Sequence, residues 1–221
     1  MKNFKALKVT YVENKHKISL EKKKFRDLKK NEVLVKVKYS GINYKDAISV
    51  TGVKKIINGN SLIPGLDFSG IVFESNSNKF SRGQKVLATG SGLGEVLDGG
   101  FTEYAYVSHK ILVCIPDNLT LLSVMQIGTA GFTAAIAIEK MIHNKQKINS
   151  GPIIVTGASG GVGSISINIL NNIGFETIAL TRKINSEKYL KDIGTKKIMK
   201  FKSSMSTKIL NKRIFAGAID N

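Results

Sequence analysis

The residues that point most directly to chemistry lie at 152–164, where the chain reads Pro-Ile-Ile-Val-Thr-Gly-Ala-Ser-Gly-Gly-Val-Gly-Ser. An apolar strand runs there into a glycine-rich turn and then a helix, the arrangement that holds the pyrophosphate of a dinucleotide. Backbone N–H groups at the start of such a helix bind the anion. The candidate cofactor-binding residues of this segment are Ser159, Gly160, Gly161, Val162 and Gly163.

The glycines of this segment have separate expected roles. Gly157 makes the tight turn, and Gly160 and Gly161 let the backbone approach phosphate. Gly163 lets the helix pack closely on the strand. Because Gly157, Gly160 and Gly163 span seven residues rather than the usual six, a tight turn without a ligand remains the alternative.

The end of the next expected strand decides between NAD and NADP. An acidic residue about 20 positions after the glycines binds the ribose 2′-hydroxyl of NAD, whereas a basic residue accommodates the 2′-phosphate of NADP. Here the chain reads Leu180-Thr181-Arg182-Lys183, a hydroxyl followed by two cations. The sequence therefore predicts NADPH as the cofactor, with Thr181, Arg182 and Lys183 at its phosphate.

The elements that would position these residues fall into two classes. The first half is β-rich, with turns of Gly, Asn and Ser between expected strands at 32–39, 70–74, 84–88, 101–108 and 111–115. A helix over 121–143 follows, interrupted around 128–131. The second half alternates strand and helix, as a parallel sheet requires, at 153–156, 161–172, 176–181, 186–193, 197–199 and the apolar run 216–220.

Composition bounds the class of protein. The 221 residues are 42% hydrophobic, enough for a sizeable core, and the formal net charge is +18. Such a charge raises the question of nucleic acid, but the lysines are spread along the chain without a basic stripe interleaved with aromatics. A lysine-rich solvated surface is the favoured reading, and a non-catalytic basic protein that binds nucleotides or nucleic acid is the alternative from another class.

Two further expectations concern location and the single cysteine. The amino terminus has no apolar run of signal-peptide length, and no later apolar stretch looks long enough to cross a bilayer, so a cytoplasmic location is expected. Cys114 cannot form an internal disulfide and lies in the apolar run 111–115. We expect it to be a small core residue, with a reactive thiol as the alternative.

Several segments together resemble the medium-chain dehydrogenase/reductase superfamily, in its quinone-oxidoreductase branch. They are Asn43-Tyr44-Lys45-Asp46-Ala47, Ile63-Pro64-Gly65-Leu66-Asp67-Phe68-Ser69-Gly70, Gly83-Gln84-Lys85-Val86, Gly99-Gly100-Phe101-Thr102-Glu103-Tyr104 and Ile127-Gly128-Thr129-Ala130-Gly131-Phe132-Thr133-Ala134. Within that branch the chain is similar to acrylyl-CoA reductases of the YhdH/AcuI type. Residues 156–163 also fit the opening motif of short-chain dehydrogenases, but that motif lies near the amino terminus in those enzymes.

The resemblance implies an α/β fold: a GroES-like catalytic domain over 1–122, then an incomplete Rossmann-type NADP-binding domain over 123–221. Family members are longer, so the resemblance implies a carboxy-terminally truncated chain whose activity is an open question. For the full-length form it implies a homodimer. No membrane and no nucleic acid are expected as partners.

The resemblance also implies zinc-independent chemistry. Asn43 stands where the family's first zinc cysteine would lie, and Gly65-Leu66-Asp67 replaces the Gly-His-Glu that supplies a histidine. His16, His109 and His143 are scattered without ligand spacing, and we expect them to be surface or hydrogen-bonded residues. No metal is therefore expected. The reaction that follows is hydride addition to an activated alkene or a quinone.

Site roles follow from the same resemblance. Asn43 and Tyr44 line the nicotinamide side as the catalytic candidates, with Tyr44 contacting the cofactor. The Tyr44 hydroxyl either offers a proton to the enolate or the ring simply packs on the nicotinamide. Thr129 and Thr133 are expected as cofactor-side hydroxyls, with ordinary helix residues as the alternative.

Two acidic residues and one basic residue complete these expectations. Asp46 and Asp67 are expected to be structural, capping a helix or accepting backbone N–H groups. Related reductases have Ser-Gly-Arg at the phosphate, so Lys183 replaces their arginine, and lysine cannot form the bidentate fork.

The expected function is NADPH-dependent reduction of acrylyl-CoA to propanoyl-CoA. An NADPH:quinone oxidoreductase on the same scaffold is the alternative, and the residues alone do not separate the two.

Overall fold

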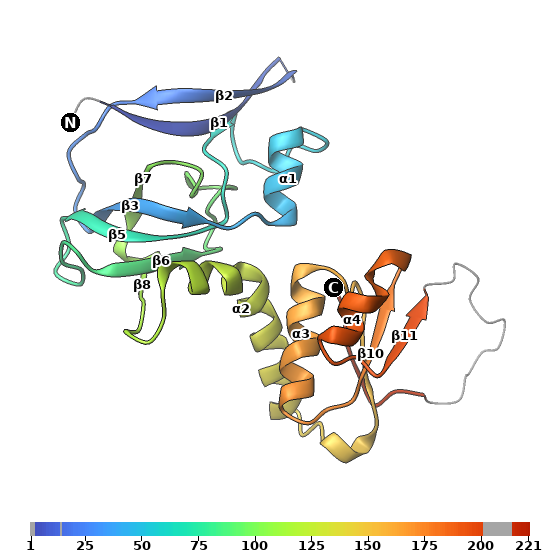
Figure 1. Cartoon of the computed structure of the whole chain (residues 1–221). Helices are drawn as coiled ribbons and strands as arrows, with labels where there is room; N and C mark the ends of the chain where they lie inside the picture. The colour runs from blue at the N-terminus through green and yellow to red at the C-terminus, as the bar shows by residue number, and fades with distance from the viewer. Residues whose placement is uncertain (1–2, 14, 201–213) are drawn as a thin grey trace. The chain divides into compact units, whose positions relative to one another are not determined.

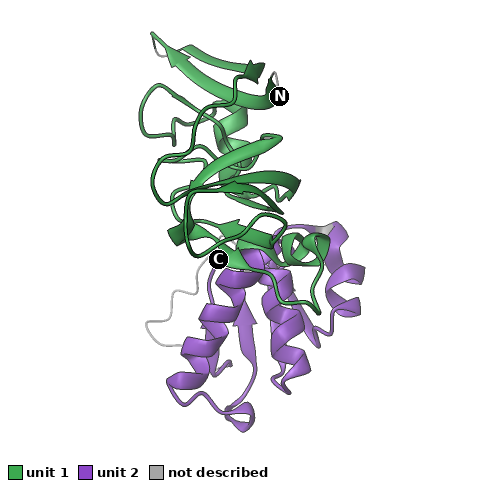
Figure 2. Cartoon of the chain, turned by 90° about the vertical axis from the view of Figure 1, so that its left-hand side faces the viewer, with its two compact units in different colours: residues 1–129 green, residues 130–221 purple. Residues whose placement is uncertain are grey.

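The computed structural model describes residues 3–13, 15–200 and 214–221. The chain divides into two compact units, residues 1–129 and 130–221, which Figure 2 shows in green and purple. This division rests on compactness, and the domain boundary predicted at 122/123 stays a prediction.

A five-stranded antiparallel sheet with the strand order β7-β3-β5-β6-β8 is the larger of the two sheets of unit 1 (Figure 1). Its strands are β3 (Glu32–Ser40), β5 (Asp67–Ser75), β6 (Lys85–Thr89), β7 (Tyr104–Ser108) and β8 (Val113–Cys114). Val33 and Val35 of β3 pack with Phe68, Val72 and Val86 in one core cluster, and Leu34 between them is buried as well. Each strand overlaps a range predicted from sequence.

A second sheet of unit 1, with the order β2-β1-β4, has no counterpart in the sequence predictions. It contains β1 (Phe4–Val12), β2 (Lys15–Lys23) and β4 (Ser61–Leu62). β1 and β2 pair over nine successive positions, from Phe4 opposite Lys23 to Val12 opposite Lys15. Backbone pairing, rather than a buried face, defines β2, because its Leu20 side chain is 69% exposed.

Cys114 is exposed, so the prediction of a buried core residue is wrong. The reason is the place of β8 in the sheet: it is the outer strand and pairs on one side only, with Cys114 opposite Val86 of β6. The apolar run at 111–115 looks like a core strand in sequence, yet only Leu112 and Ile115 in it are buried.

The helix α2 (Leu121–His143) is kinked at Gly128, whose φ of 51° and ψ of −160° are not helical, which confirms the predicted interruption. Among the described residues, this helix alone is long and apolar enough to cross a membrane, judged by length and composition only. The expectation that no stretch reaches such a length is therefore wrong. The 23 residues are continuous only across the kink, and Ala134 and Ile138 in the second segment are buried.

Unit 2 contains a four-stranded parallel sheet with the order β11-β10-β9-β12. Its strands are β9 (Ile153–Val155), β10 (Thr177–Thr181), β11 (Lys197–Lys200) and β12 (Gly217–Ile219), and its further helices are α3 (Gly161–Asn172) and α4 (Glu187–Asp192). Ile153, Val155, Ile167 and Leu170 form one core cluster with Ile138 of α2. A β-rich first unit followed by this parallel α/β unit confirms the predicted fold class.

The remaining helical elements are short. α1 (Tyr44–Thr51) ends at Gly52, which adopts the left-handed conformation at φ 70°. The 3-10 turns are η1 (His109–Ile111), η2 (Ile148–Ser150) and η3 (Ile184–Ser186).

Candidate cofactor site and its supporting residues

A hollow of about 490 Å³ lies in unit 2 where three parallel strands end. In open α/β sheets this carboxyl edge is where ligands bind. The residues that line it lie at or just after the ends of β9, β10 and β12: Thr156, Gly157, Ser159, Gly160, Leu180, Thr181, Arg182, Lys183, Asp220 and Asn221. Five of the predicted cofactor residues are among them: Ser159, Gly160, Thr181, Arg182 and Lys183.

The glycine-rich segment forms one side of this hollow. Gly157 has a φ of 51°, and its carbonyl accepts a hydrogen bond of 2.8 Å from the Gly160 N–H, which closes the turn. α3 starts directly afterwards at Gly161, with Gly160 as its N-cap. The first N–H groups of a helix have no carbonyl partner within it, so this end of α3 is suited to an anion.

Gly163 is a position where only glycine fits. A Cβ there would lie 2.5 Å from the Gly157 carbonyl oxygen and 2.8 Å from the Ala158 Cα, and both are backbone atoms that cannot move aside. The absent side chain lets α3 approach the turn. Gly161, Val162 and Gly163 themselves do not line the hollow, and their contact with a cofactor stays a prediction.

The opposite side of the hollow is formed by the end of β10. Thr181 is buried, and its hydroxyl oxygen accepts a 3.0 Å hydrogen bond from the Lys183 N–H and lies 3.3 Å from the Ser159 hydroxyl. This pair of bonds fixes the backbone from which Arg182 and Lys183 extend into solvent. Two cations therefore border the hollow at the position predicted for the 2′-phosphate.

The sequence analysis missed the contribution of the residues after β12. The Thr156 hydroxyl donates to Asp220 Oδ1 at 2.6 Å and accepts from the Asn221 N–H at 2.8 Å. The Asn221 side-chain amide donates to the Thr156 carbonyl at 3.0 Å, so the ends of β9 and β12 are tied together. The signal for these residues was the apolar run at 216–220, since polar residues that follow a parallel strand face the same edge.

In unit 1, Asp67 joins two of the predicted site residues. Its carboxylate accepts a 3.0 Å hydrogen bond from the Asn43 side-chain amide at Oδ1 and a 2.7 Å bond from the Thr129 N–H at Oδ2. Asp67 is 1% exposed. Side chains at Gly41 and Gly128 would collide with this carboxylate, so both glycines are needed for its approach.

Asp46 is a second acidic residue that holds Asn43, and it also binds the backbone at Gly65 and Leu66. Its Oδ2 accepts from the Asn43 N–H at 2.8 Å, and its Oδ1 accepts from the N–H groups of Gly65 and Leu66 at 3.0 Å each. Burial raises the pKa of the Asp46 carboxyl above its usual value, and the nearby Asp67 adds to the rise, while the bonds from Asn43 and Leu66 oppose it. Asp46 and Asp67 thus have the structural roles expected of them.

The remaining predicted residues are surface residues. Tyr44, the first residue of α1, is 82% exposed, and Thr133 is exposed on α2. The catalytic role of Asn43 and Tyr44, and the cofactor contacts of Tyr44, Thr129 and Thr133, stay predictions.

The three histidines are hydrogen-bonded or exposed to solvent, as expected from the sequence. His16 Nε2 is 3.0 Å from the Ser49 carbonyl oxygen, His109 Nδ1 is 2.6 Å from the Ser77 hydroxyl, and His143 is exposed. Within the described ranges, no three His, Cys, Asp or Glu side chains gather where they could hold a metal ion.

A β-rich unit followed by a parallel α/β unit with a glycine turn at its carboxyl edge defines the medium-chain dehydrogenase/reductase class. The model of the alcohol dehydrogenase GroES-like domain matches residues 29–117. The chain belongs to the quinone-oxidoreductase branch of this superfamily, in the group with AcuI, YhdH and YhfP.

Three relatives illustrate the match. The chain is 40% identical over 193 residues to the probable acrylyl-CoA reductase AcuI of Escherichia coli (strain K12), covering 87% of this chain and 60% of that protein. It is 40% identical over 196 residues to the putative quinone oxidoreductase YhfP of Bacillus subtilis (strain 168), covering 88% and 59%. The yhdH oxidoreductase of Salmonella enterica, solved in complex with NADP, superposes with a TM-score of 0.92 at 38% identity, covering 98% of this chain and 67% of that one.

The match is partial in length, and one relative is solved with the other cofactor. The chain spans about 60% of the length of these curated relatives. The yhfP protein of Bacillus subtilis, with a TM-score of 0.89, 37% identity and coverage of 99% and 67%, is solved with NAD bound.

The buried carboxylate of Asp67 generates the first prediction. Asp67→Ala leaves the Asn43 amide and the Thr129 N–H without their acceptor, and we expect the free energy of unfolding to fall by about 2–4 kcal/mol. Asp67→Asn keeps one acceptor oxygen, but its amide NH₂ group then faces either the Asn43 amide or the Thr129 N–H, which are both donors. We therefore expect a loss of stability between that of Asp67→Ala and none. Urea titration followed by circular dichroism measures both.

Glu74→Ala is the matched control, because Glu74 is an exposed carboxylate on the same strand. Its effect should stay within about 0.5 kcal/mol, as for other surface substitutions. Equal unfolding midpoints for Asp67→Ala and Glu74→Ala would contradict the role given to Asp67.

Proposed function

We propose that the protein reduces an activated alkene with NADPH, most specifically acrylyl-CoA to propanoyl-CoA. The observation that carries the proposal is the hollow in unit 2, bordered by a glycine turn on one side and by Arg182 and Lys183 on the other. The names of the relatives support the substrate, since the AcuI proteins of Escherichia coli and Ruegeria pomeroyi are named as acrylyl-CoA reductases.

The residues present fit a dinucleotide phosphate. A Cβ at Gly163 would fill the space that lets α3 approach the turn, and the hollow is large enough for part of a nucleotide. The cations of Arg182 and Lys183 favour the additional 2′-phosphate of NADPH, although Lys183 acts as a point charge rather than a bidentate fork. When bound, NADPH supplies the hydride.

The conjugated thioester needs little activation from the protein. Its carbonyl makes the β-carbon electrophilic, so reduction adds a hydride to the β-carbon and a proton to the α-carbon. What the protein provides is position and exclusion of water. Asn43 and Tyr44 are proposed to do this at the start of α1, where two hydrogen bonds hold Asn43, one from its N–H to Asp46 and one from its side-chain amide to Asp67.

The cofactor preference gives the second prediction. Arg182→Ala/Lys183→Ala should reduce the ratio of NADPH to NADH affinity by at least about tenfold, because a charge-assisted hydrogen bond is worth about 1.5–3 kcal/mol before solvent screening. Isothermal titration calorimetry with each nucleotide measures the ratio. The double variant Lys188→Ala/Lys191→Ala removes two cations from α4 outside the hollow and should leave the ratio unchanged. Full discrimination by the first variant would mean that the phosphate is recognised elsewhere.

Tyr44 gives the third prediction. With its side chain 82% exposed, the ring is free to pack on a planar ligand, and we propose this role rather than proton donation. Tyr44→Phe should then keep kcat within about threefold, whereas loss of a general acid lowers rates by about 100-fold or more. Tyr44→Ala should lower kcat, and neither change should alter the NADPH/NADH ratio. A 100-fold loss in Tyr44→Phe alone would assign the proton donor to this hydroxyl.

The substrate gives the fourth prediction. The same scaffold serves a quinone in the alternative reading, which the name of the YhfP relative favours. We expect kcat/KM for NADPH oxidation to be higher with acrylyl-CoA than with 1,4-benzoquinone, measured by absorbance at equal ionic strength. The reverse order would move the assignment to quinone reduction, and activity with neither would contradict both.

A further inference from the structure

Unit 1 contains a separate cavity of about 270 Å³ that the proposed reaction does not use. It lies between the segment that follows β2 and the strand β7. Its lining combines aromatic rings with charged side chains: Phe4, Lys23, Lys24, Phe25, Arg26, Ile63, Asp98, Gly99, Thr102, Tyr104, Ala105 and Tyr106.

The apolar walls of this cavity are a contiguous set of rings. Phe25 lies 5.0 Å from both Phe4 and Tyr104, measured between ring centroids, and the Phe25–Tyr104 pair is edge-to-face. Phe4 in turn lies 5.8 Å from Tyr104 and 6.4 Å from Tyr106. Aromatic rings at these separations attract a further ring in the same offset or edge-to-face geometries.

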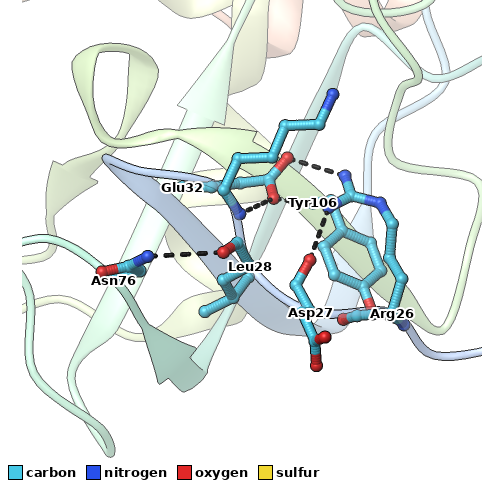
Figure 3. A network of polar contacts seen from close by, with 7 residues as sticks. Arg26, Asp27, Leu28, Glu32, Asn76 and Tyr106 are labelled. Carbon is cyan, nitrogen blue, oxygen red and sulfur yellow. Dashed lines mark hydrogen bonds and ion pairs between the residues drawn. The ribbon is translucent and has the colours of Figure 1, made fainter.

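One wall is rigid because its polar groups are already paired. Figure 3 shows the Arg26 guanidinium beside the Tyr106 ring, 4.1 Å from its centroid, with two hydrogen bonds of 2.7 Å to the Glu32 carboxylate. The Tyr106 hydroxyl accepts from the Arg26 N–H at 2.9 Å and donates to the Arg26 carbonyl at 3.1 Å. The side-chain hydrogen bonds between Arg26 and Glu32 lower the pKa of Glu32 and raise that of Arg26, so both groups stay charged.

The charges around the cavity favour an anion. Its lining has three cations, Lys23, Lys24 and Arg26, and one carboxylate, Asp98; of the cations, Arg26 is already paired with Glu32. That carboxylate is engaged, since its Oδ1 accepts from the Ile63 N–H at 2.9 Å and its Oδ2 lies 3.6 Å from the Lys23 ammonium. Lys24 is exposed, and the described residues offer it no carboxylate within ion-pair distance.

We propose that this cavity binds a small aromatic carboxylate, with its ring against the partly exposed rings of Phe25 and Tyr104 and its carboxylate at Lys24. The volume sets the size, because a cavity of about 150 Å³ already holds benzene, and 270 Å³ leaves room for one substituted ring. The aromatic side chains bury the ring of the ligand, and the unpaired Lys24 ammonium makes the cavity bind a carboxylate more tightly than a neutral ring.

Binding is tested directly, without reference to turnover, so failure of this proposal and failure of the proposed reaction are distinguishable. The probes are benzoate and 4-hydroxybenzoate, compared with benzyl alcohol as a ring without charge and acetate as a charge without a ring. Calorimetry and chemical-shift mapping at constant ionic strength should show the aromatic carboxylates binding at least about tenfold more tightly than either comparison compound.

Charge reversal locates the site. Lys24→Glu should weaken 4-hydroxybenzoate binding by at least about tenfold, since the substitution replaces an attraction at short range with a repulsion. Lys22→Glu is the matched control: Lys22 is exposed on β2, does not line the cavity and gives the same change in net charge. Both substitutions are at the surface and should leave the thermal midpoint unchanged.

A last variant separates this cavity from the hollow in unit 2, which is also basic. Arg182→Ala/Lys183→Ala should bind 4-hydroxybenzoate as the unchanged protein does. Loss of binding in that variant would place the anion in the unit 2 hollow and overturn the proposal. Equal affinity for benzyl alcohol, or no binding of any aromatic carboxylate at millimolar concentration, would overturn it as well.

Discussion

The buried carboxylate of Asp67 is the interaction on which the local order of unit 1 depends. An ionised group removed from water is costly unless hydrogen bonds satisfy it, and here its two oxygens take one donor each from segments far apart in the chain. One donor belongs to Asn43, at the start of α1, and the other to Thr129, just after the kink in α2. If either segment shifted, one oxygen of the buried carboxylate would lose its hydrogen-bond donor.

A steric constraint plays the corresponding part in unit 2. The approach of α3 to the Gly157 turn is possible only because Gly163 has no side chain, and that approach brings the first N–H groups of the helix to the carboxyl edge of the sheet. The hydrogen bonds of Thr181 and Thr156 then fix the ends of β10 and β12 on either side of the turn. Backbone geometry thus shapes the hollow, and side-chain charge enters through Arg182 and Lys183 after β10 and through Asp220 after β12.

What could be predicted from sequence follows from how local each signal is. The predicted helix at 161–172 matches α3 because its start is marked by a glycine turn and its length by one apolar periodicity. The strands β1 and β2 were missed for the opposite reason. In β1 the buried positions are Phe4, Ala6, Val9 and Tyr11, so the alternation changes phase midway, and β2 has no consistently buried face. The exposure of Cys114 and the tie between Asp67 and Thr129 depend on which segments become neighbours, which no local pattern encodes.

The high net charge indicates a binding partner only where the cations lie beside a concave surface. Most lysines among the described residues are exposed to solvent, where an isolated charge or ion pair contributes little to stability. At two places cations instead border a concave surface: Arg182 and Lys183 beside the glycine turn, and Lys23 and Lys24 beside the ring-lined cavity. A charge at the edge of a concavity acts on a ligand that is partly removed from water, where the same Coulomb interaction is stronger. The number of lysines therefore says little about partners, whereas the shape of the surface beneath a few of them indicates both the charge and the size of what can bind.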